Sequence, residues 1–395
     1  MKRVFCFLLI FLLIFTGCTK PQEEISKQAK IRVVELHGTP YERGYQHGKI
    51  LKEEIRYITN RVEDSVCLLE GDVKGKIVFR FMLEMAKDLE GKFSKKFPEF
   101  KELKEEMRGI SDGAGVSYDI ILLINLIDEI AATYYWYLDP ILKTFACSSF
   151  VARSSQGLIV GRNLDYGILL SDLPYFLTVF IYHPEKGYPF ISISWPGLVG
   201  TYSGISQDLY IFLNVSSSNK NTEGAPECLV TRRIIQYSKN LDEAAASVLH
   251  PLQGLNLLVG TKDDAMVIEI SPNKKAIRKL DKFVIATNHF ASLEMQEEQA
   301  PGEFDERPVP LPDGTSVVQE NTKVRAEKIR KMLEEEDDVS MEYAKKILTE
   351  VSTRGLTLQS IVYIPQKGDL FVTVNPKVPI CEGQFQLDEL LNSQN

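Results

Sequence analysis

The feature that most constrains the fold is a pair of strand-like runs separated by a short polar connection. The first run, CSSFVAR, begins at Cys147, and the second, LIVGRNLDY, ends at Tyr166. The short connection between them, SSQG, is rich in Ser and Gly and predicts a β-hairpin whose turn is centred near Ser155 and Gln156. Both runs therefore belong to one antiparallel sheet.

This hairpin brings three chemically different groups together. It folds Cys147 back opposite residues 163–165, where cross-strand neighbours lie roughly 5 to 8 Å apart. The sequence does not fix the register, and a slip of one residue exchanges which of Arg162 and Asp165 shares the face of Cys147. In either register a thiol, a guanidinium and a carboxylate lie close together.

This grouping has a chemical use if Cys147 becomes a chain terminus. A neighbouring cation such as Arg162 can lower the pKa of a thiol from about 8.5 to between roughly 3.5 and 7.5. A free α-amine titrates near about 7.7 to 8.0, so an amine on Cys147 itself would serve as general base, oriented by Asp165. The alternative is a buried cysteine at the start of a strand, beside an ordinary ion pair.

The hairpin resembles the nucleophile hairpin of N-terminal-nucleophile (Ntn) hydrolases. CSSFVA followed by GRNLD is similar to the motif of bile salt hydrolases, acid ceramidase, N-acylethanolamine acid amidase and the penicillin acyl-CoA acyltransferases. Upstream, VELHGTPYERGYQHG resembles the opening motif of the penicillin acyltransferase group. Downstream, GISQDLYIFLNVSS, VIATNHF and TKVRAEKIRKML follow in the family's order. The resemblance covers residues 32–378.

The resemblance implies autocleavage between Ala146 and Cys147, and it assigns three more site residues. An oxyanion-hole Asn corresponds to Asn214, a second active-site Asn to Asn288, and an Arg on the following helix to Arg325. Arg330 is the less favoured substitute for that Arg.

Each of these three residues also has a structural alternative. Asn214 would be a core amide, or the first residue of a glycosylation sequon, Asn-Val-Ser. Asn288 would cap a turn, and Arg325 would be a solvated charge on a helix.

The amino terminus predicts export. Lys2 and Arg3 precede an apolar run over residues 4–15, which is followed by TGC and a polar segment. This is the pattern of a secretory signal, and the run is short for a membrane span. The TGC triplet resembles a lipobox in which Cys18 is lipidated, although Phe15 stands where an aliphatic residue is usual. The alternatives are therefore a lipoprotein anchored to the cell membrane and a plain secreted protein.

Composition excludes some partners. The net charge of −8 and the lack of a basic patch argue against nucleic acid. Outside the signal region the cysteines are too few, in a chain of 395 residues, for a disulfide scaffold; they are Cys67, Cys147, Cys228 and Cys381. The five histidines show no metal-ligand spacing, so we expect no metal. We also expect no cofactor, and the oligomeric state stays open.

Periodicity predicts an α+β chain with a helical lead. Helical spacing covers residues 41–70, 75–110 and 117–143, and later Glu227–Lys239, Leu241–Leu249, Thr322–Glu335 and Met341–Val351. Strand-like runs follow Cys147 at Phe176–Tyr182, Phe190–Trp195, Leu209–Val215, Leu255–Gly260, Met266–Ile270, Ser360–Ile364 and Leu370–Val374. Residues 292–319 show no core periodicity and predict a loop near the site.

The resemblance implies the family's four-layer αββα sandwich. The expected organisation is a signal peptide at 1–17, a linker at 18–31, a helical prosegment at 32–146 and an Ntn-hydrolase catalytic domain at 147–395.

The sequence thus predicts a self-processing cysteine amidohydrolase or acyltransferase that acts on a small-molecule N-acyl amide through a thioester on Cys147. Tyr166, Trp195 and Tyr202 near the expected cleft favour an acyl or aryl group over a sugar. The alternative is a non-catalytic surface lipoprotein that binds an N-acyl or cell-wall ligand on the same scaffold, and a structural lipoprotein comes third.

Overall fold

The computed structural model describes most of the chain after the predicted signal region. It covers residues 30–133, 145–166, 172–216, 218, 223–300, 306–310 and 316–392. The predicted signal peptide and Cys18 lie outside the described residues. None of the helices within these ranges combines the length and the apolar character that a membrane crossing needs.

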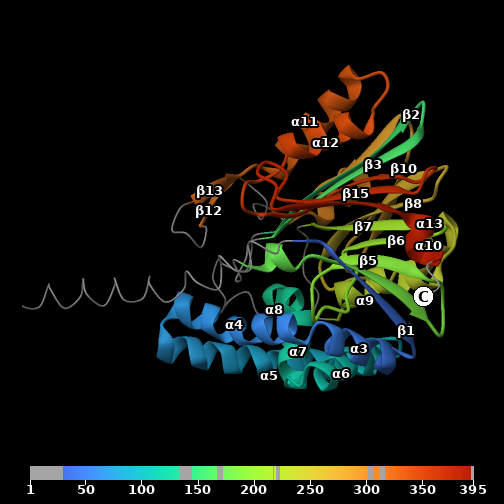
Figure 1. The fold of residues 1–395 in the computed structure, drawn as a ribbon. Coiled ribbons are helices and arrows are strands. Elements are labelled where there is room, and N and C mark those ends of the chain that lie inside the picture. The colour runs from blue at the N-terminus through green and yellow to red at the C-terminus, as the bar shows by residue number, and fades with distance from the viewer. Residues whose placement is uncertain are drawn as a thin grey trace, which may run out of the picture.

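An eight-stranded sheet forms one half of the framework (Figure 1). Its strand order is β1-β4-β5-β6-β7-β8-β9-β10, and β1 runs parallel to β4 whereas the other neighbours are antiparallel. The strands are β1 (Arg32–Gly38), β4 (Thr178–Pro184), β5 (Phe190–Ser194), β6 (Ser203–Ser206), β7 (Tyr210–Ser216), β8 (Gly254–Gly260), β9 (Ala265–Ile270) and β10 (Lys275–Lys279).

A six-stranded antiparallel sheet forms the other half, in the order β11-β2-β3-β14-β15-β16. Its strands are β2 (Phe145–Ser154), β3 (Gly157–Tyr166), β11 (Phe283–Ala286), β14 (Thr357–Ile364), β15 (Asp369–Val374) and β16 (Cys381–Gln386). The β2–β3 pair is the predicted hairpin, with Ser155 and Gln156 at its turn. Gly157 follows the turn at a φ of 104°, which a residue with a Cβ rarely adopts.

The two sheets pack face to face through an apolar cluster. Val151 and Val160 of the six-stranded sheet share this cluster with Ile193 and Phe212 of the eight-stranded sheet. Branched aliphatic and aromatic side chains alternate inward along these strands, so burial of one face holds the sheets together. This interface is where β2 of the hairpin meets β7.

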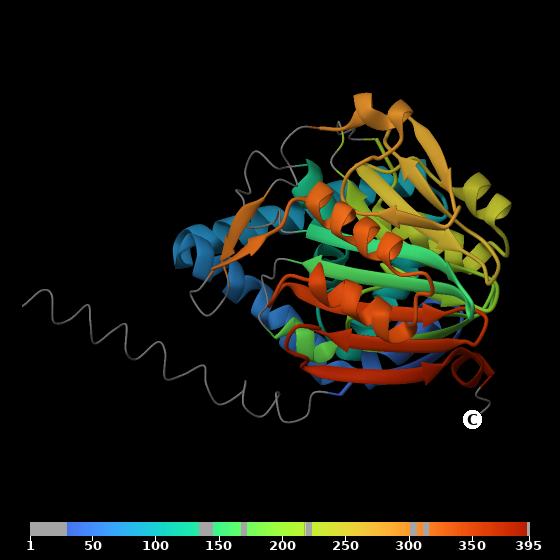
Figure 2. The ribbon, with the colours of Figure 1, turned by 90° about the horizontal axis from the view of Figure 1, so that it is seen from above.

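Helices cover the outer face of each sheet, as Figures 1 and 2 show. The eight-stranded sheet is covered by α3 (Pro40–Ile50), α4 (Lys52–Glu70), α5 (Asp72–Lys96), α6 (Phe100–Ala114), α7 (Tyr118–Asn125), α8 (Ile127–Thr133), α9 (Glu227–Tyr237) and α10 (Leu241–Ser247). The six-stranded sheet is covered by α11 (Thr322–Glu335) and α12 (Met341–Glu350). A short α13 (Leu387–Asn392) follows β16. The protein therefore has an α+β fold.

In the described part of the segment before Cys147, residues 40–133 are mainly helical and a strand precedes them. Residues 32–38 form β1, which joins the eight-stranded sheet as an edge strand beside β4. Periodicity did not indicate this strand because only Val34 and Leu36 of its 7 residues are buried, which gives too little alternation to predict a strand. The helices then break where Gly71 and Gly115 adopt positive φ angles.

The predicted loop at 292–319 holds short elements, so that prediction is wrong for part of its length. A 3₁₀ helix covers Leu293–Glu298, and β12 (Arg307–Pro310) pairs with β13 (Ser316–Gln319). The hairpin belongs to neither large sheet. Both strands have four residues, and two of the four in β12 are prolines. Such short strands show no alternating core pattern in the sequence.

Candidate active site

The register of the hairpin decides which group shares the face of Cys147. Cys147 pairs with Leu164 and Ser149 pairs with Arg162, so Arg162 lies on the Cys147 face. Asp165 pairs with Ala146 and lies on the opposite face. The carboxylate is thus placed beside the peptide bond that precedes Cys147.

The Cys147 thiol is buried, with only 4% of the residue exposed. Arg162 Nη2 lies 3.9 Å from Cys147 Sγ, a long contact for a hydrogen bond. Burial raises the pKa of the thiol, and the charge of Arg162 offsets this only in part. Arg162 thus lowers the thiol pKa as expected, but in the uncleaved chain burial outweighs it.

Arg162 connects the hairpin to the eight-stranded sheet. Its Nε donates to Ser203 Oγ at 2.8 Å and its Nη1 donates to Asn214 Oδ1 at 3.3 Å. Asn214 Nδ2 in turn donates to Ser149 Oγ at 2.9 Å and to the Asn256 carbonyl at 3.2 Å. The structure thus places Asn214 on the Cys147 face, and both of its amide hydrogens are in use.

Asn288 and Arg325 hold the main chain of Cys147. The Cys147 N–H donates to Asn288 Oδ1 at 2.7 Å, and Arg325 Nη1 donates to the Cys147 carbonyl at 2.7 Å. Arg325 Nη2 also donates to Asn288 Oδ1 at 2.8 Å, so the two side chains support each other. Arg325 is buried rather than solvated, whereas Arg330 pairs on the surface with Glu327 and Glu334. The structure therefore brings Arg325, not Arg330, to Cys147.

Only one of the two carboxylate oxygens of Asp165 accepts a hydrogen bond in the described part of the chain. Thr357 Oγ1 donates to its Oδ1, while Oδ2 is buried and has no hydrogen-bond partner in the described part of the chain. Burial raises the pKa of Asp165 to about 6, against the opposing charge of Arg325. An unpaired buried acceptor is costly, so a cationic or N–H donor would be stabilised at this oxygen.

A largely apolar pocket opens at Cys147. Its walls come from both sides of Cys147 in the sequence, with Ile58 and Val62 on α4 facing Leu213 and Val215 on β7. The aromatic residues that sequence analysis placed near the cleft do line this pocket; they are Tyr166, Trp195 and Tyr202. An apolar group adjoining a carbonyl would be desolvated here.

Sequence analysis did not single out Asp128, which contacts two of the aromatic residues that line the pocket. The hydroxyls of Tyr166 and Tyr202 donate to it at 3.0 and 2.8 Å. Burial raises the pKa of Asp128, and the neighbouring Glu129 and Glu227 are buried beside it with raised pKa values. In the sequence Asp128 is one acidic residue in the middle of a predicted helix, and nothing in the pattern indicated that it would be buried beside the pocket.

The upstream motif PYERGYQHG does not line the pocket, but it contacts the turn that follows Trp195 in the pocket wall. Gly44 and Gly48 lie so close to α6 that an added Cβ would collide with its backbone. His47 Nε2 accepts the Gly197 N–H at 3.0 Å, which fixes the turn that follows Trp195. Burial lowers the pKa of His47 to about 4, so the ring is a neutral acceptor.

The fold and this site define an α+β protein with a buried cysteine whose main chain is held by an Asn and an Arg. The family model for acyl-coenzyme A:6-aminopenicillanic acid acyl-transferase matches residues 152–375. The chain belongs to this family. The match begins just after Cys147 and includes the other five predicted catalytic residues.

Three curated relatives, each from a different organism, match part of the chain. The chain is 31% identical to protein dcd1A of Dictyostelium discoideum over 257 residues, 58% of this chain and 55% of that protein. It is 30% identical to an uncharacterized protein of Archaeoglobus fulgidus over 275 residues, 63% and 45% of the two chains. It is 24% identical to the 40 kDa form of an acyl-coenzyme A:6-aminopenicillanic-acid-acyltransferase of Emericella nidulans over 263 residues, 65% and 68%. The chain spans about half the length of the first two relatives.

Proposed function

We propose that the protein is a self-processing cysteine amidohydrolase or acyltransferase that acts on the linear amide bond of an N-acyl compound through a thioester on Cys147. The observation that carries this proposal is the pair of hydrogen bonds that Asn288 and Arg325 make to the Cys147 main chain. Asn288 Oδ1 accepts from the nitrogen that cleavage would turn into an α-amine, and Arg325 binds the carbonyl of the same residue. These two side chains are therefore concentrated on the nitrogen and the carbonyl of the residue at which processing would occur.

Processing would begin with attack of Cys147 Sγ on the Ala146 carbonyl carbon. The carbon–sulfur bond forms, the carbon–nitrogen bond breaks, and the Cys147 nitrogen gains a proton. Water then hydrolyses the thioester and leaves a carboxylate on Ala146. Asp165 faces Ala146 across the ladder, and its unpartnered Oδ2 would accept from the new α-amine.

Turnover would use the same atoms on an external amide. The α-amine takes the thiol proton, the thiolate attacks the carbonyl carbon, and the amine returns the proton to the leaving nitrogen. Asn214 would donate to the oxyanion by releasing Ser149 Oγ, since both of its amide hydrogens are otherwise occupied. Water or an acceptor amine then releases the acyl group.

The apolar walls of the pocket favour an apolar acyl or aryl group in the substrate. Trp195, Leu213 and Val215 adjoin Cys147 there, so the acyl side of the amide would lie along them. Burial of each additional CH₂ is worth about 0.8 kcal/mol. We therefore expect kcat/KM to rise with acyl chain length until the pocket is filled.

The proposal includes the architecture and the location. Helices on the outer face of each sheet support an αββα sandwich of the Ntn-hydrolase type, with residues 32–146 as prosegment and 147–395 as catalytic domain. Export and a lipid anchor at Cys18 are supported by the amino-terminal pattern.

Mass spectrometry of the purified protein tests the proposal, because processing yields a fragment that begins at Cys147. Cys147→Ala should stay a single chain, whereas Cys228→Ala, which removes another buried thiol, should process normally. The processed protein is then assayed on amides that share one amine and differ in acyl length. Full activity without cleavage would contradict the mechanism. Binding of these amides without turnover would favour the alternative, a non-catalytic binding lipoprotein.

A further inference from the structure

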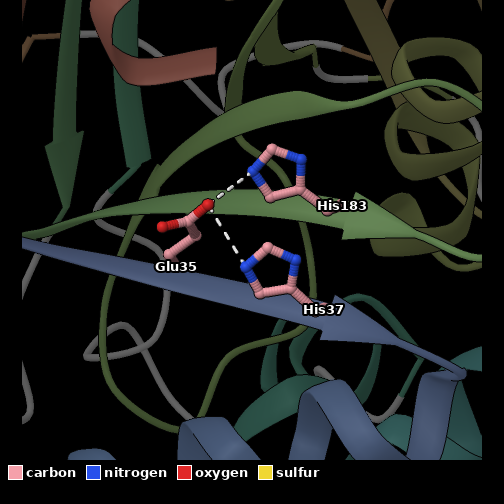
Figure 3. A group of neighbouring side chains, drawn as sticks. All are labelled: Glu35, His37 and His183. Carbon is pink, nitrogen blue, oxygen red and sulfur yellow. Dashed lines mark ion pairs between the residues drawn. The ribbon is translucent and has the colours of Figure 1, made fainter. Parts of the chain in front are cut away.

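Three potential metal ligands meet at the edge of the eight-stranded sheet, outside the candidate active site. Figure 3 shows Glu35 and His37 on β1 and His183 on β4, with both imidazoles turned toward the carboxylate. Glu35 Oε1 lies 3.2 Å from His37 Nε2 and 2.9 Å from His183 Nε2. The three ligand atoms all lie within 4.8 Å of one another.

The parallel pairing of β1 with β4 creates this cluster. His37 is directly opposite His183 in the register, and Glu35 lies on the same face of β1 two residues earlier. The two rings stack with centroids 4.6 Å apart and planes inclined by 6°. Gln46 on α3 fixes this end of β1 by binding the His37 N–H and carbonyl at 2.9 and 3.0 Å.

The contact between His183 and Glu35 is close but poorly oriented for a hydrogen bond. The His183 Nε2 is buried and lies 2.9 Å from Glu35 Oε1, close enough for an ion pair but poorly oriented for an N–H···O hydrogen bond, and no other group in the described part of the chain binds it. A cation between the two atoms would satisfy both, because a metal needs the nitrogen lone pair and not an N–H aimed at the oxygen.

The distances suit a small transition-metal ion. Bond lengths of about 2.0 to 2.2 Å from Zn²⁺ to nitrogen or oxygen place tetrahedral ligands about 3.3 Å apart. Both distances to Glu35 Oε1 are near this value. The His37 side chain is 57% exposed, so its ring has room to approach His183 and leaves a fourth position open to water.

We propose that Glu35, His37 and His183 form a site for a divalent first-row transition metal such as Zn²⁺, with water as the fourth ligand. Two imidazoles and one carboxylate suit such an ion better than Mg²⁺, which prefers oxygen ligands. The site would cross-link β1 to β4, two strands that come from opposite sides of Cys147. It does not depend on the proposed processing or catalysis.

Calorimetric titration of the chelator-treated protein with ZnCl₂ tests the site. We expect one equivalent of Zn²⁺ to bind and MgCl₂ not to compete. Loss of an outer-shell partner alone weakens metal binding by about 10 to 100-fold, so His37→Ala and Glu35→Gln should each weaken Zn²⁺ by at least about 100-fold. His250→Ala, which alters a histidine elsewhere on the surface, is the matched control and should leave the affinity unchanged.

Thermal melting gives a second readout that is independent of enzymatic activity. Zn²⁺ should raise the Tm of the wild-type protein and of His250→Ala, but not that of His37→Ala, since a ligand that binds only the native state stabilises it. His37 is largely exposed, so its replacement should not prevent folding. Equal Zn²⁺ affinity in the wild type, His37→Ala and Glu35→Gln would overturn the proposal, as would equal binding of Mg²⁺.

Discussion

The buried carboxylate of Glu106 offers the sharpest test of what holds the two parts of the chain together. Glu106 on α6 is 1% exposed and accepts at 2.9 Å from Arg43 Nη2 on α3 and from Arg232 Nη2 on α9. Arg232 also lies over the ring of Tyr182, with its guanidinium carbon 4.3 Å from the centroid. Two buried guanidinium groups, one from each side of Cys147, therefore share one carboxylate as their counter-charge.

Replacing Glu106 with Gln preserves the shape and removes the charge. Breaking a buried ion pair costs about 3 to 5 kcal/mol, because the remaining charge stays desolvated without a partner. Two guanidinium groups lose their counter-charge here, so we expect the upper half of that range. Since native proteins are stable by only about 5 to 15 kcal/mol, the unfolding midpoint should fall strongly.

The adjacent residue supplies the control. Glu105 pairs with Arg108 at 2.7 Å on the surface of the same helix, and about half of the Arg108 side chain is exposed. Glu105→Gln should change stability by less than about 1 kcal/mol. Adding Arg43→Met to Glu106→Gln should recover part of the loss by removing one unpaired charge. Guanidinium unfolding followed by fluorescence measures all four proteins, and equal midpoints for Glu106→Gln and Glu105→Gln would refute the reasoning.

Three further predictions concern the site and its surroundings. Processed Asn214→Ala should lose roughly 10² to 10³-fold in kcat with little change in KM, because an oxyanion donor acts mainly in the transition state; near-normal turnover would make Asn214 a core amide. In precursor that still carries the Ala146–Cys147 peptide bond, iodoacetamide should modify Cys147 more slowly than Cys67, which is less buried, whereas in processed protein Cys147 should react first; the same order in both forms would exclude activation by processing. Burial, followed by the charge of Asp128, raises the pKa of Glu129 to about 8. The native carboxyl therefore keeps its proton while the unfolded one ionises above about 4.3, and stability should fall as pH rises from about 5 to 8. Melting curves for Glu129→Gln should show a weaker dependence on pH than those for the exposed control Glu294→Gln, and parallel curves would contradict this.

Local patterns made much of the sheet and the helices predictable. The β2–β3 hairpin was visible because its two runs are adjacent and its turn is short, and α11 agrees with the predicted range 322–335. β1 was not predicted because only two of its residues are buried, and its pairing with β4, far downstream (Arg32 with Thr178), leaves no local signal.

The sequence predicted that certain residues would lie near Cys147, but it could not predict their contacts. Cys147, Asn288 and Arg325 do come together, yet only the three-dimensional structure shows that the latter two bind the main chain of the first. The raised thiol pKa could not be predicted, because burial depends on packing between the sheets. Glu35, His37 and His183 form a cluster only through the register of a parallel pair.

The position of β1 at the edge of the eight-stranded sheet has a consequence for how the protein can be produced. Without residues 32–146, β4 would become an unprotected edge, and the apolar face now covered by α3–α8 would meet water. An open strand edge beside an apolar surface invites self-association. The leading segment would therefore remain as a permanent small subunit after processing, rather than depart as a propeptide. Residues 147–395 expressed alone should aggregate, and co-expression with 32–146 should restore solubility.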